Sequence, residues 1–267
     1  MAQAPRCILI TGASAGLGAA LARAYAGPDM TLGLIARNNE RLLAVAESCR
    51  QRGAQVVTAS LDVTDTEALQ TWIKNFDHAH PIDLLIANAG ITSQLGPQGQ
   101  AEPLECIHRV LDTNLRGCID SVDAVLHAMR QRGHGQIALV SSLAALHGMP
   151  VTPAYCAAKA GVKAYGEALR GWLAPEGIHV NVICPGFVES EMSRQFSAPK
   201  PFMISAEHAA RRIQRGLSRN RACISFPFPL NLGMWLLSVL PFPLASFFSA
   251  SRAIIACADR NRAQRDD

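Results

Sequence analysis

The chain has 267 residues, of which 49% are hydrophobic and 17% charged, so it carries enough apolar material for one large buried core. The formal net charge of +4 is mild, although Lys200 and five arginines between Arg211 and Arg221 gather late in the sequence. Most of these arginines fall on one expected helix, Ala206–Arg219, without aromatic residues between them. This pattern does not favour nucleic-acid binding, and a solvated helix face or a membrane-facing strip explains it better.

The cysteine and histidine spacings predict neither a metal site nor a disulfide framework. Eight cysteines occur, but none form a CxxC pair and none lie at metal-ligand spacing from a histidine. Most stand in apolar runs, where a free cysteine behaves as a small hydrophobic residue. The first residues, MAQAPRCILITG, lack the pattern of a secretory signal. We therefore expect a cytoplasmic protein with reduced cysteines.

Apolar, strand-like runs alternate with helical patterns along most of the chain. The expected strands are Cys7–Thr11, Thr31–Ala36, Gln55–Ser60, Leu84–Asn88, Ile137–Ser141, His179–Cys184 and Cys223–Phe226. The expected helices begin near Gly16, Asn39, Asp65, Glu102, Asn114, Pro153 and Ala206. Strands that are apolar on both faces belong to parallel sheets covered by helices on both sides. The sequence thus predicts an α/β fold, a Rossmann-like doubly wound parallel sheet, as a single domain over residues 1–226.

A glycine-rich turn follows the first expected strand. It reads Thr11-Gly12-Ala13-Ser14-Ala15-Gly16-Leu17-Gly18 and leads into a helix. Glycines let the backbone turn tightly and approach a pyrophosphate, which then sits on the amides and positive dipole of the helix N-terminus. In the first βα unit of such a sheet this turn predicts a dinucleotide site, and a tight turn without a ligand is the alternative.

The end of the second expected strand bears on cofactor preference. Folds that bind NAD usually place an acid near here to accept ribose hydroxyls, whereas an arginine suits a 2′-phosphate. Here the two positions are Ala36 and Arg37, so no acid repels the phosphate and a planar cation can bind it. We expect NADP(H) to be preferred over NAD(H), with an exposed arginine at a strand end as the alternative.

Tyr155 and Lys159 stand four residues apart, and Ser142 precedes Tyr155 by thirteen residues. Residues four apart share a helix face, so the phenol and the ammonium would enter one site. A free tyrosine titrates near pH ~10, and a fixed cation lowers that pKa by favouring the phenolate. Ser142 could hold a substrate oxygen against the phenol. The three residues predict a proton-transfer device on a helix that Thr152 caps and Pro153 begins, rather than a chance surface pair.

With these motifs in this order, the chain resembles the classical short-chain dehydrogenases/reductases from about Arg6 to Phe226. Thr11–Gly18 matches the TGxxxGxG motif of the family. Further matches are Asp62-Val63 after the third strand, Asn88-Ala89-Gly90 after the fourth, and the PG loop Pro185–Ser190. At family-like spacings, the catalytic tetrad positions hold Asn114, Ser142, Tyr155 and Lys159.

The resemblance implies an oxidoreductase that interconverts a ketone or aldehyde with its alcohol. Tyr155 would exchange a proton with the substrate oxygen as hydride moves to or from the nicotinamide. Lys159 would lower the pKa of Tyr155 and bind the ribose, while Ser142 polarises the carbonyl. Asn114 would hold a water that links Lys159 to solvent, with a helix-capping role as its alternative. The residues expected to bind the cofactor are Gly12, Ser14, Gly16, Leu17, Gly18, Arg37, Asp62, Val63, Asn88, Ala89, Gly90, Tyr155, Lys159, Pro185, Gly186, Val188 and Ser190.

The chain departs from the family pattern after Phe226. Residues 227–258 form an apolar extension, and the charged residues 259–267 are expected to fray. The helix-compatible stretch Leu230–Leu240 would reach only ~16 Å, against ~30 Å of hydrocarbon core, so a spanning helix is disfavoured. Pro241 and Pro243 predict two short helices with a bend. The extension either covers the substrate cleft and an oligomer interface, or dips into one leaflet on the cytoplasmic face.

Arginine-then-apolar C-termini also occur in family members that act on steroids and other lipids at membranes. We therefore expect a lipophilic substrate of the steroid, sphingoid-ketone or acyl type, reduced rather than oxidised because cellular NADP is kept reduced. His147, Met149 and Phe187 are pocket candidates, with an exposed loop or plain core as their alternatives. A non-catalytic NADP(H)-binding sensor or scaffold is the alternative function, which the intact tetrad disfavours.

Small residues on the Tyr155 helix allow another helix to approach closely. They are Ala157, Ala158, Ala160, Gly161 and Ala164. In the family the corresponding helix commonly forms a dimer interface, so the resemblance implies a homodimer or homotetramer. Packing inside one subunit is the alternative.

Overall fold

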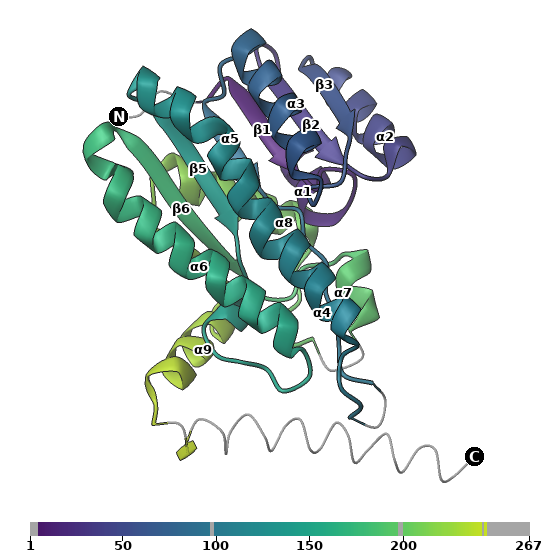
Figure 1. Ribbon diagram of the computed structural model, residues 1–267, viewed down its shortest axis with the longest axis vertical. Coiled ribbons are helices and arrows are strands. Elements are labelled where there is room, and N and C mark those ends of the chain that lie inside the picture. Colours follow the sequence, from purple (N-terminus) through teal and green to yellow (C-terminus); the bar gives the residue numbers. More distant parts are fainter. Residues whose placement is uncertain (1–4, 97–98, 197–199, 242, 245–267) are drawn as a thin grey trace.

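The computed structural model describes residues 5–96, 99–196, 200–241 and 243–244. Its strands are β1 (Cys7–Thr11), β2 (Thr31–Ala36), β3 (Gln55–Ser60), β4 (Leu84–Ala87), β5 (Gly135–Val140), β6 (Ile178–Pro185) and β7 (Cys223–Phe226). They form one parallel sheet in the order β3-β2-β1-β4-β5-β6-β7 (Figure 1). The chain reverses its direction of winding between β1 and β4, which in doubly wound folds opens a crevice at the carboxyl ends of the strands.

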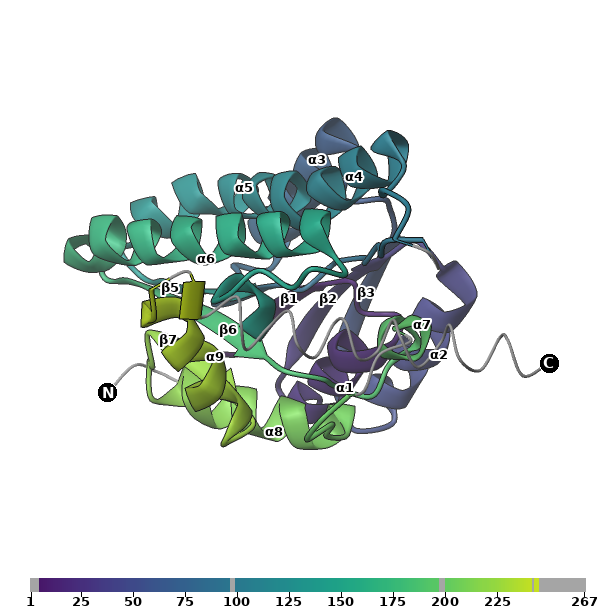
Figure 2. The same ribbon diagram turned by 90° about the horizontal axis from the view of Figure 1, so that it is seen from below.

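The helices cover both faces of the sheet. They are α1 (Gly16–Tyr25), α2 (Asn39–Arg50), α3 (Thr66–Ala79), α4 (Leu104–Leu111), α5 (Gly117–Arg132), α6 (Pro153–Leu173), α7 (Glu191–Gln195), α8 (Ala206–Ser218) and α9 (Leu230–Val239). One core cluster joins the sheet to α1, α2 and α8, and a second joins it to α3, α5 and α6 (Figure 2). The expected α/β fold is confirmed.

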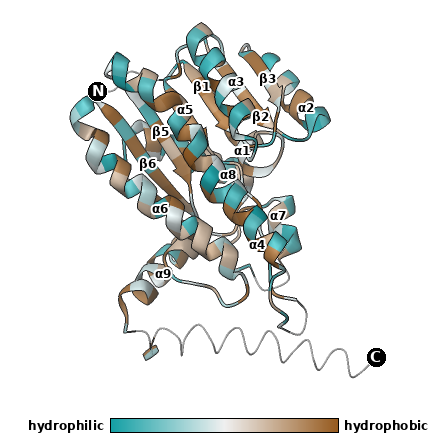
Figure 3. Ribbon diagram, viewed as in Figure 1, coloured by the Kyte–Doolittle hydropathy of each residue, from teal (hydrophilic) through white to brown (hydrophobic). Residues whose placement is uncertain are grey.

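Local sequence signals set several helix starts. The side chain of Asn38 accepts the Arg41 N–H at 2.9 Å, Asp65 accepts the Ala68 N–H at 3.1 Å, and Ser205 accepts the His208 N–H at 3.2 Å. These contacts satisfy amides that have no partner within α2, α3 and α8. The central strands β1 and β4 are buried along their whole length, whereas the edge strand β3 is partly exposed. Figure 3 shows brown central strands between helices of mixed hydropathy.

The segment around Asn114 differs from expectation. α4 runs through a π-helical turn, Asp112–Arg116, directly into α5, so no new helix begins at Asn114. Asn114 lies inside that turn and makes no capping hydrogen bond to a helix start, which overturns its capping interpretation. Turns of this kind inside α-helices often mark functional positions.

The C-terminal extension begins with the expected short apolar helix, α9. Leu230 and Met234 pack on the buried side chains of Leu143, Val182 and Cys184. The second short helix predicted beyond Pro243, and the charged tail, lie outside the described residues. Within the described part of the chain, no helix is both long and apolar enough to cross a membrane.

Candidate active site

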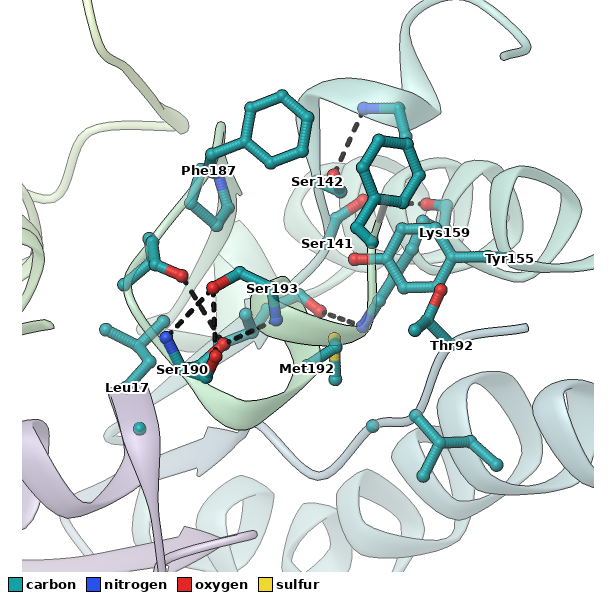
Figure 4. A pocket seen from close by; sticks show the side chains of 18 of the residues that line it. Leu17, Thr92, Ser141, Ser142, Tyr155, Lys159, Phe187, Ser190, Met192 and Ser193 are labelled. Atoms are coloured by element: carbon teal, nitrogen blue, oxygen red, sulfur yellow. Dashed lines mark hydrogen bonds between the residues drawn. The ribbon is translucent and has the colours of Figure 1, made fainter. Parts of the chain in front are cut away.

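A cleft of about 1600 Å³ opens at the carboxyl ends of the strands. Its walls come from the glycine turn, the segments that follow β2, β3, β4 and β5, the first two turns of α6, the β6–α7 segment and α9. All of the predicted site residues line it except Asn114, which lies behind the wall. Figure 4 shows Ser142, Tyr155 and Lys159 gathered together, with Ser190 and Ser193 of the β6–α7 segment across the pocket. Residues more than 170 positions apart in sequence, Gly12 and Ser190 for example, therefore share one site.

The glycine turn needs glycine for steric reasons. Gly12 and Gly16 have φ values of +67° and +53°, a left-handed backbone that disfavours side chains. A Cβ atom on Gly12 would lie 2.8 Å from the Cα atom of Ala89. A Cβ atom on Gly18 would overlap the carbonyl oxygen of Gly12. The turn is thus packed closely against the end of β4, and its residues line the cleft.

Asn88 holds this turn in place. Its amide Nδ2 donates to the carbonyl oxygens of Thr11 at 3.0 Å and Gly12 at 3.1 Å. In return, the Thr11 Oγ1 atom accepts the backbone N–H groups of Asn88 and Ala89, each at 3.1 Å. β4 ends one residue earlier than predicted, because the Asn88 N–H bonds to this hydroxyl instead of to a neighbouring strand. Thr11 therefore works as a partner of Asn88, a role that its place in the motif did not show.

The N-terminus of α1 fits a pyrophosphate. Its N-cap residue, Ala15, is extended and offers no side-chain hydrogen bond to the first amides. Unpaired amides and the positive end of the helix dipole attract anions. Together with the close-packed glycines, this is the cradle that a dinucleotide requires.

The far end of the cleft carries opposite charges. The Arg37 Nη1 atom lies 3.5 Å from the Asp62 Oδ2 atom, with more than a third of each side chain exposed. Partial burial raises the pKa of Asp62, but hydrogen bonds from Thr64 and the Arg37 cation outweigh it and hold the pKa below its ordinary value. Arg41, which sequence analysis did not single out, also lines this end and pairs with Glu191 of α7 at 2.7 Å.

Tyr155 and Ser142 face each other near the middle of the cleft. Burial raises the pKa of the Tyr155 phenol to about 12, although its hydrogen bond with Ser142 opposes the rise. The spacing of Tyr155 and Lys159 predicted that the Lys159 cation lowers this pKa. That expectation is wrong for this arrangement, because loss of solvation outweighs any stabilisation of the phenolate. The phenol is protonated at neutral pH.

Lys159 is almost fully buried, with 4% of its surface exposed. Its Nζ atom donates to the Val140 carbonyl oxygen at 2.8 Å and lies 5.8 Å from the centroid of the Tyr155 ring. Burial lowers the pKa of Lys159 to about 8. The Ser141 hydroxyl fixes the helix backbone below it by donating to the Lys159 carbonyl oxygen at 2.7 Å.

The side-chain amide of Asn114 forms two hydrogen bonds with the backbone of Ile91. Its Nδ2 atom donates to the Ile91 carbonyl oxygen at 2.9 Å, and its Oδ1 atom accepts the Ile91 N–H at 2.7 Å. A Cβ atom on Gly90 would lie 3.1 Å from this Oδ1 atom and 3.4 Å from the Lys159 Nζ atom. Asn114 therefore lies beside Lys159 and fixes the segment after β4.

The PG loop, Pro185–Ser190, forms another wall of the cleft. Gly186 donates its N–H to the Phe226 carbonyl oxygen at 2.8 Å, which ties the loop to β7. Ser190 begins α7 through reciprocal bonds with Ser193: its Oγ atom accepts the Ser193 N–H at 3.1 Å, and its own N–H reaches the Ser193 hydroxyl at 3.0 Å. The Ser190 hydroxyl, expected to bind a carboxamide, is thus engaged in this cap in the structure.

The substrate end is mainly apolar. Its side chains come from the segment after β5, the PG loop and α9, and they are Leu143, Met149, Val151, Phe187, Met192, Phe196, Leu230, Met234 and Leu237. His147 also lines the cleft, so the pocket interpretation of His147, Met149 and Phe187 holds over the exposed-loop and plain-core alternatives. α9 also lines the cleft, as expected if the C-terminal extension covers the substrate cleft, which was one of the two interpretations of that extension.

Comparison with known proteins places the chain in a family. Residues 6–201 match the family model for short chain dehydrogenases. An uncharacterised oxidoreductase of Myxococcus xanthus is 34% identical over 250 residues, 93% of this chain and 97% of that protein. A ketoacyl reductase of a Nostoc species is 32% identical over 204 residues, 75% of this chain and 70% of that protein. A short-chain dehydrogenase from Sphingobium yanoikuyae, solved in complex with NADPH, shares the fold with a TM-score of 0.74 at 24% identity, covering 94% of this chain and 95% of that one.

The chain belongs to the short-chain dehydrogenase/reductase family. It is accordingly an oxidoreductase of the CH-OH/C=O class, and the family uses a nicotinamide dinucleotide, for which the glycine turn and the α1 amides are suited.

Proposed function

We propose that this protein is an NADP(H)-dependent carbonyl reductase with a lipophilic substrate. The observation that carries the proposal is the joining, in one cleft, of a phosphate cradle, a protonated phenol and an apolar pocket. Bound nicotinamide dinucleotide would supply the hydride.

Tyr155 donates a proton to the substrate oxygen. The phenol is protonated at neutral pH, as donation of a proton to a carbonyl oxygen requires. Ser142, paired with the phenol, directs a second hydroxyl at the same oxygen. Lys159 stays charged below a pH of about 8 and favours the phenolate left after proton transfer. Asn114 keeps the segment beside Lys159 in place.

Arg37 and Arg41 support a preference for NADP(H). Both line the adenosine end of the cleft, and each holds only an exposed ion pair, with Asp62 and Glu191 respectively. Exposed pairs contribute about 0–1 kcal/mol, so a doubly charged 2′-phosphate can redirect either guanidinium at little cost.

A lipophilic substrate is supported by the apolar walls and by α9. Leu230, Met234 and Leu237 of α9 face the cleft, and the related Nostoc protein is a ketoacyl reductase. Long-chain or polycyclic ketones of acyl, sphingoid or steroid type fit such walls better than small polar carbonyls do.

The outer side of α9 fits a membrane surface. Phe228, Trp235 and Val239 are 72%, 52% and 58% exposed, respectively. On the same side of the sheet, α8 carries the exposed cations Arg211 and Arg212 (Figure 2). Exposed apolar side chains with neighbouring cations bind anionic lipid surfaces. Trp235→Ser should lower cosedimentation with phosphatidylserine-containing vesicles several-fold, and unchanged cosedimentation would refute the contact.

Self-association through α6 remains a proposal that its outer surface supports. Ala157, Ala160 and Ala164 are exposed there. Light scattering of the wild type and of Ala160→Glu would test it: a dimer or tetramer that dissociates in the variant supports the interface, and a monomeric wild type refutes it.

The experiment for the function is oxidation of NADPH and NADH over a panel of carbonyl compounds. The panel runs from small diketones through 3-oxoacyl thioesters to steroids and long-chain ketones, with and without lipid vesicles. We expect turnover with NADPH, fastest for a long or polycyclic ketone. NADPH binding without turnover of any member would favour the sensor function instead.

A further inference from the structure

Glu102 carries a buried carboxylate that neither the sequence motifs nor the family resemblance singles out. It precedes α4 and is 7% exposed. Its Oε2 atom accepts the backbone N–H of Ala154 at 3.0 Å, and its Oε1 atom accepts the hydroxyl of Ser93. Within the described part of the chain no lysine or arginine forms an ion pair with Glu102. Its carboxylate is therefore stabilised by hydrogen bonds rather than by a neighbouring cation.

The contact with Ala154 lies at the start of the helix that bears Tyr155. The sequence predicted that Thr152 would cap α6 with its hydroxyl. Thr152 does occupy the N-cap position, but its side chain makes no capping bond and donates instead to the Ser93 carbonyl oxygen at 2.7 Å. Pro153, the first helical residue, has no N–H. The first amide of α6 that needs a partner is therefore that of Ala154, and Glu102 provides it from another element.

The same group of contacts holds one wall of the cleft. Ser93, which bonds both Glu102 and Thr152, directly follows Thr92, and Thr92 lines the cleft. Two residues further on, Leu95 donates its N–H to the Val151 carbonyl oxygen at 3.0 Å. The segment after β4 and the start of α6 are thus joined through Glu102, immediately before Tyr155.

We propose that Glu102 is a positioning residue for the reaction. Its carboxylate caps α6 in place of a local side chain and adds a negative charge at the positive end of the helix dipole. It thereby sets where the Tyr155 phenol stands relative to Ile91 and Thr92, which line the cleft. A shift of the Tyr155 hydroxyl by a fraction of an ångström slows proton transfer to the substrate. The same shift leaves the phosphate cradle, at the other end of the cleft, unchanged. The proposal rests on the proposed reductase function.

Three variants test it: Glu102→Ala, Glu102→Gln and the control Glu105→Ala, which removes an exposed acid three residues along the same chain segment. Measurements are kcat and KM for a small aromatic diketone, the solvent deuterium isotope effect on kcat, the NADPH binding constant, and hydrogen exchange in the peptide 150–157. We expect Glu102→Ala to lower kcat by about tenfold or more, raise the isotope effect, speed exchange in that peptide, and leave NADPH affinity within about twofold. Glu102→Gln keeps an acceptor oxygen for the Ala154 N–H and should restore most of kcat.

Two results would overturn the proposal. One is a Glu102→Ala protein that matches Glu105→Ala in kcat and in exchange. The other is a loss of kcat, NADPH affinity and exchange protection throughout the chain in both Glu102 variants, which is general loss of folding. If the wild type reduces no carbonyl compound, the reductase function fails, and the exchange measurement still decides whether Glu102 holds the start of α6.

Discussion

The Nζ atom of Lys159 lies 5.8 Å from the centroid of the Tyr155 ring and is held there by the carbonyl oxygen of Val140. Lys159 is buried and Tyr155 is partly buried, and burial moves their pKa values in opposite directions, to about 8 for Lys159 and about 12 for Tyr155. Each shift disfavours the charged form. The free protein therefore keeps its phenol protonated and holds its ammonium at an energetic cost.

The first prediction concerns stability and pH. The pKa of Lys159 is about 8 in the folded chain, below its ordinary value of 10.5, so between these pH values the unfolded chain binds more protons and stability rises with pH. Lys159→Met removes this dependence. The variant should be more stable than the wild type at pH 7, by an order of 1–3 kcal/mol, with the difference shrinking toward pH 10. Urea unfolding at several pH values measures it, and a difference independent of pH would contradict the buried cation.

The second prediction concerns the cofactor. Arg37→Asp places a carboxylate beside Asp62 at the end where a 2′-phosphate would bind. Repulsion between the new carboxylate and the 2′-phosphate should raise the dissociation constant for NADPH by about tenfold or more, and NADH should bind more tightly than it does to the wild type. Fluorescence titration with both cofactors measures this, with Arg211→Asp, an exposed residue on α8, as the charge-matched control. An unchanged ratio of NADPH to NADH affinity in Arg37→Asp would show that Arg37 does not bind the 2′-phosphate.

A third prediction tests the phosphate cradle. Gly18→Ala puts a Cβ atom against the Gly12 carbonyl oxygen and 2.6 Å from the Asn88 Nδ2 atom, so the turn must move. We expect NADPH affinity to fall by at least about tenfold, because the amides lose their alignment. Gly171→Ala is the matched control, since nothing lies within 4 Å of the added atom. Equal affinity in the two variants would argue against a cofactor at this turn.

The fourth prediction concerns the α9 wall. Met234 lines the cleft, whereas its neighbour Trp235 is 52% exposed. Met234→Trp fills part of the pocket, so kcat/KM should fall by about tenfold for a steroid or long-chain ketone and by less than about twofold for a small diketone. Trp235→Ala should leave both within about twofold in detergent-free buffer. A uniform loss across substrate sizes in Met234→Trp would place the substrate elsewhere.

Local patterns predicted the sheet and the outline of the site well. β1 and β2 match the expected ranges residue for residue, because each is an uninterrupted buried apolar run between turn residues. Apart from Asn114, the motif residues from Gly12 to Ser190 meet in one cleft because parallel strands bring their carboxyl ends to one edge.

What the sequence did not predict depends on contacts between distant residues. Thr152 is a good capping residue locally, but a carbonyl oxygen on Ser93, 59 positions away, takes its hydroxyl. Glu102 caps α6 from 52 positions away, and no local pattern marks such a partner. The predicted direction of the Tyr155 pKa shift was wrong. The sequence shows a cation four residues after Tyr155, whereas the burial that raises the pKa follows from the whole fold.

The measurement that tests the account most directly is NADPH oxidation by Tyr155→Phe, using the carbonyl compound that the wild type reduces fastest. The variant loses only the phenolic hydroxyl and keeps the ring that packs beside Lys159. We predict a fall in kcat of about 100-fold or more with NADPH affinity within about threefold of the wild type. Turnover at the wild-type rate would contradict Tyr155 as the proton donor.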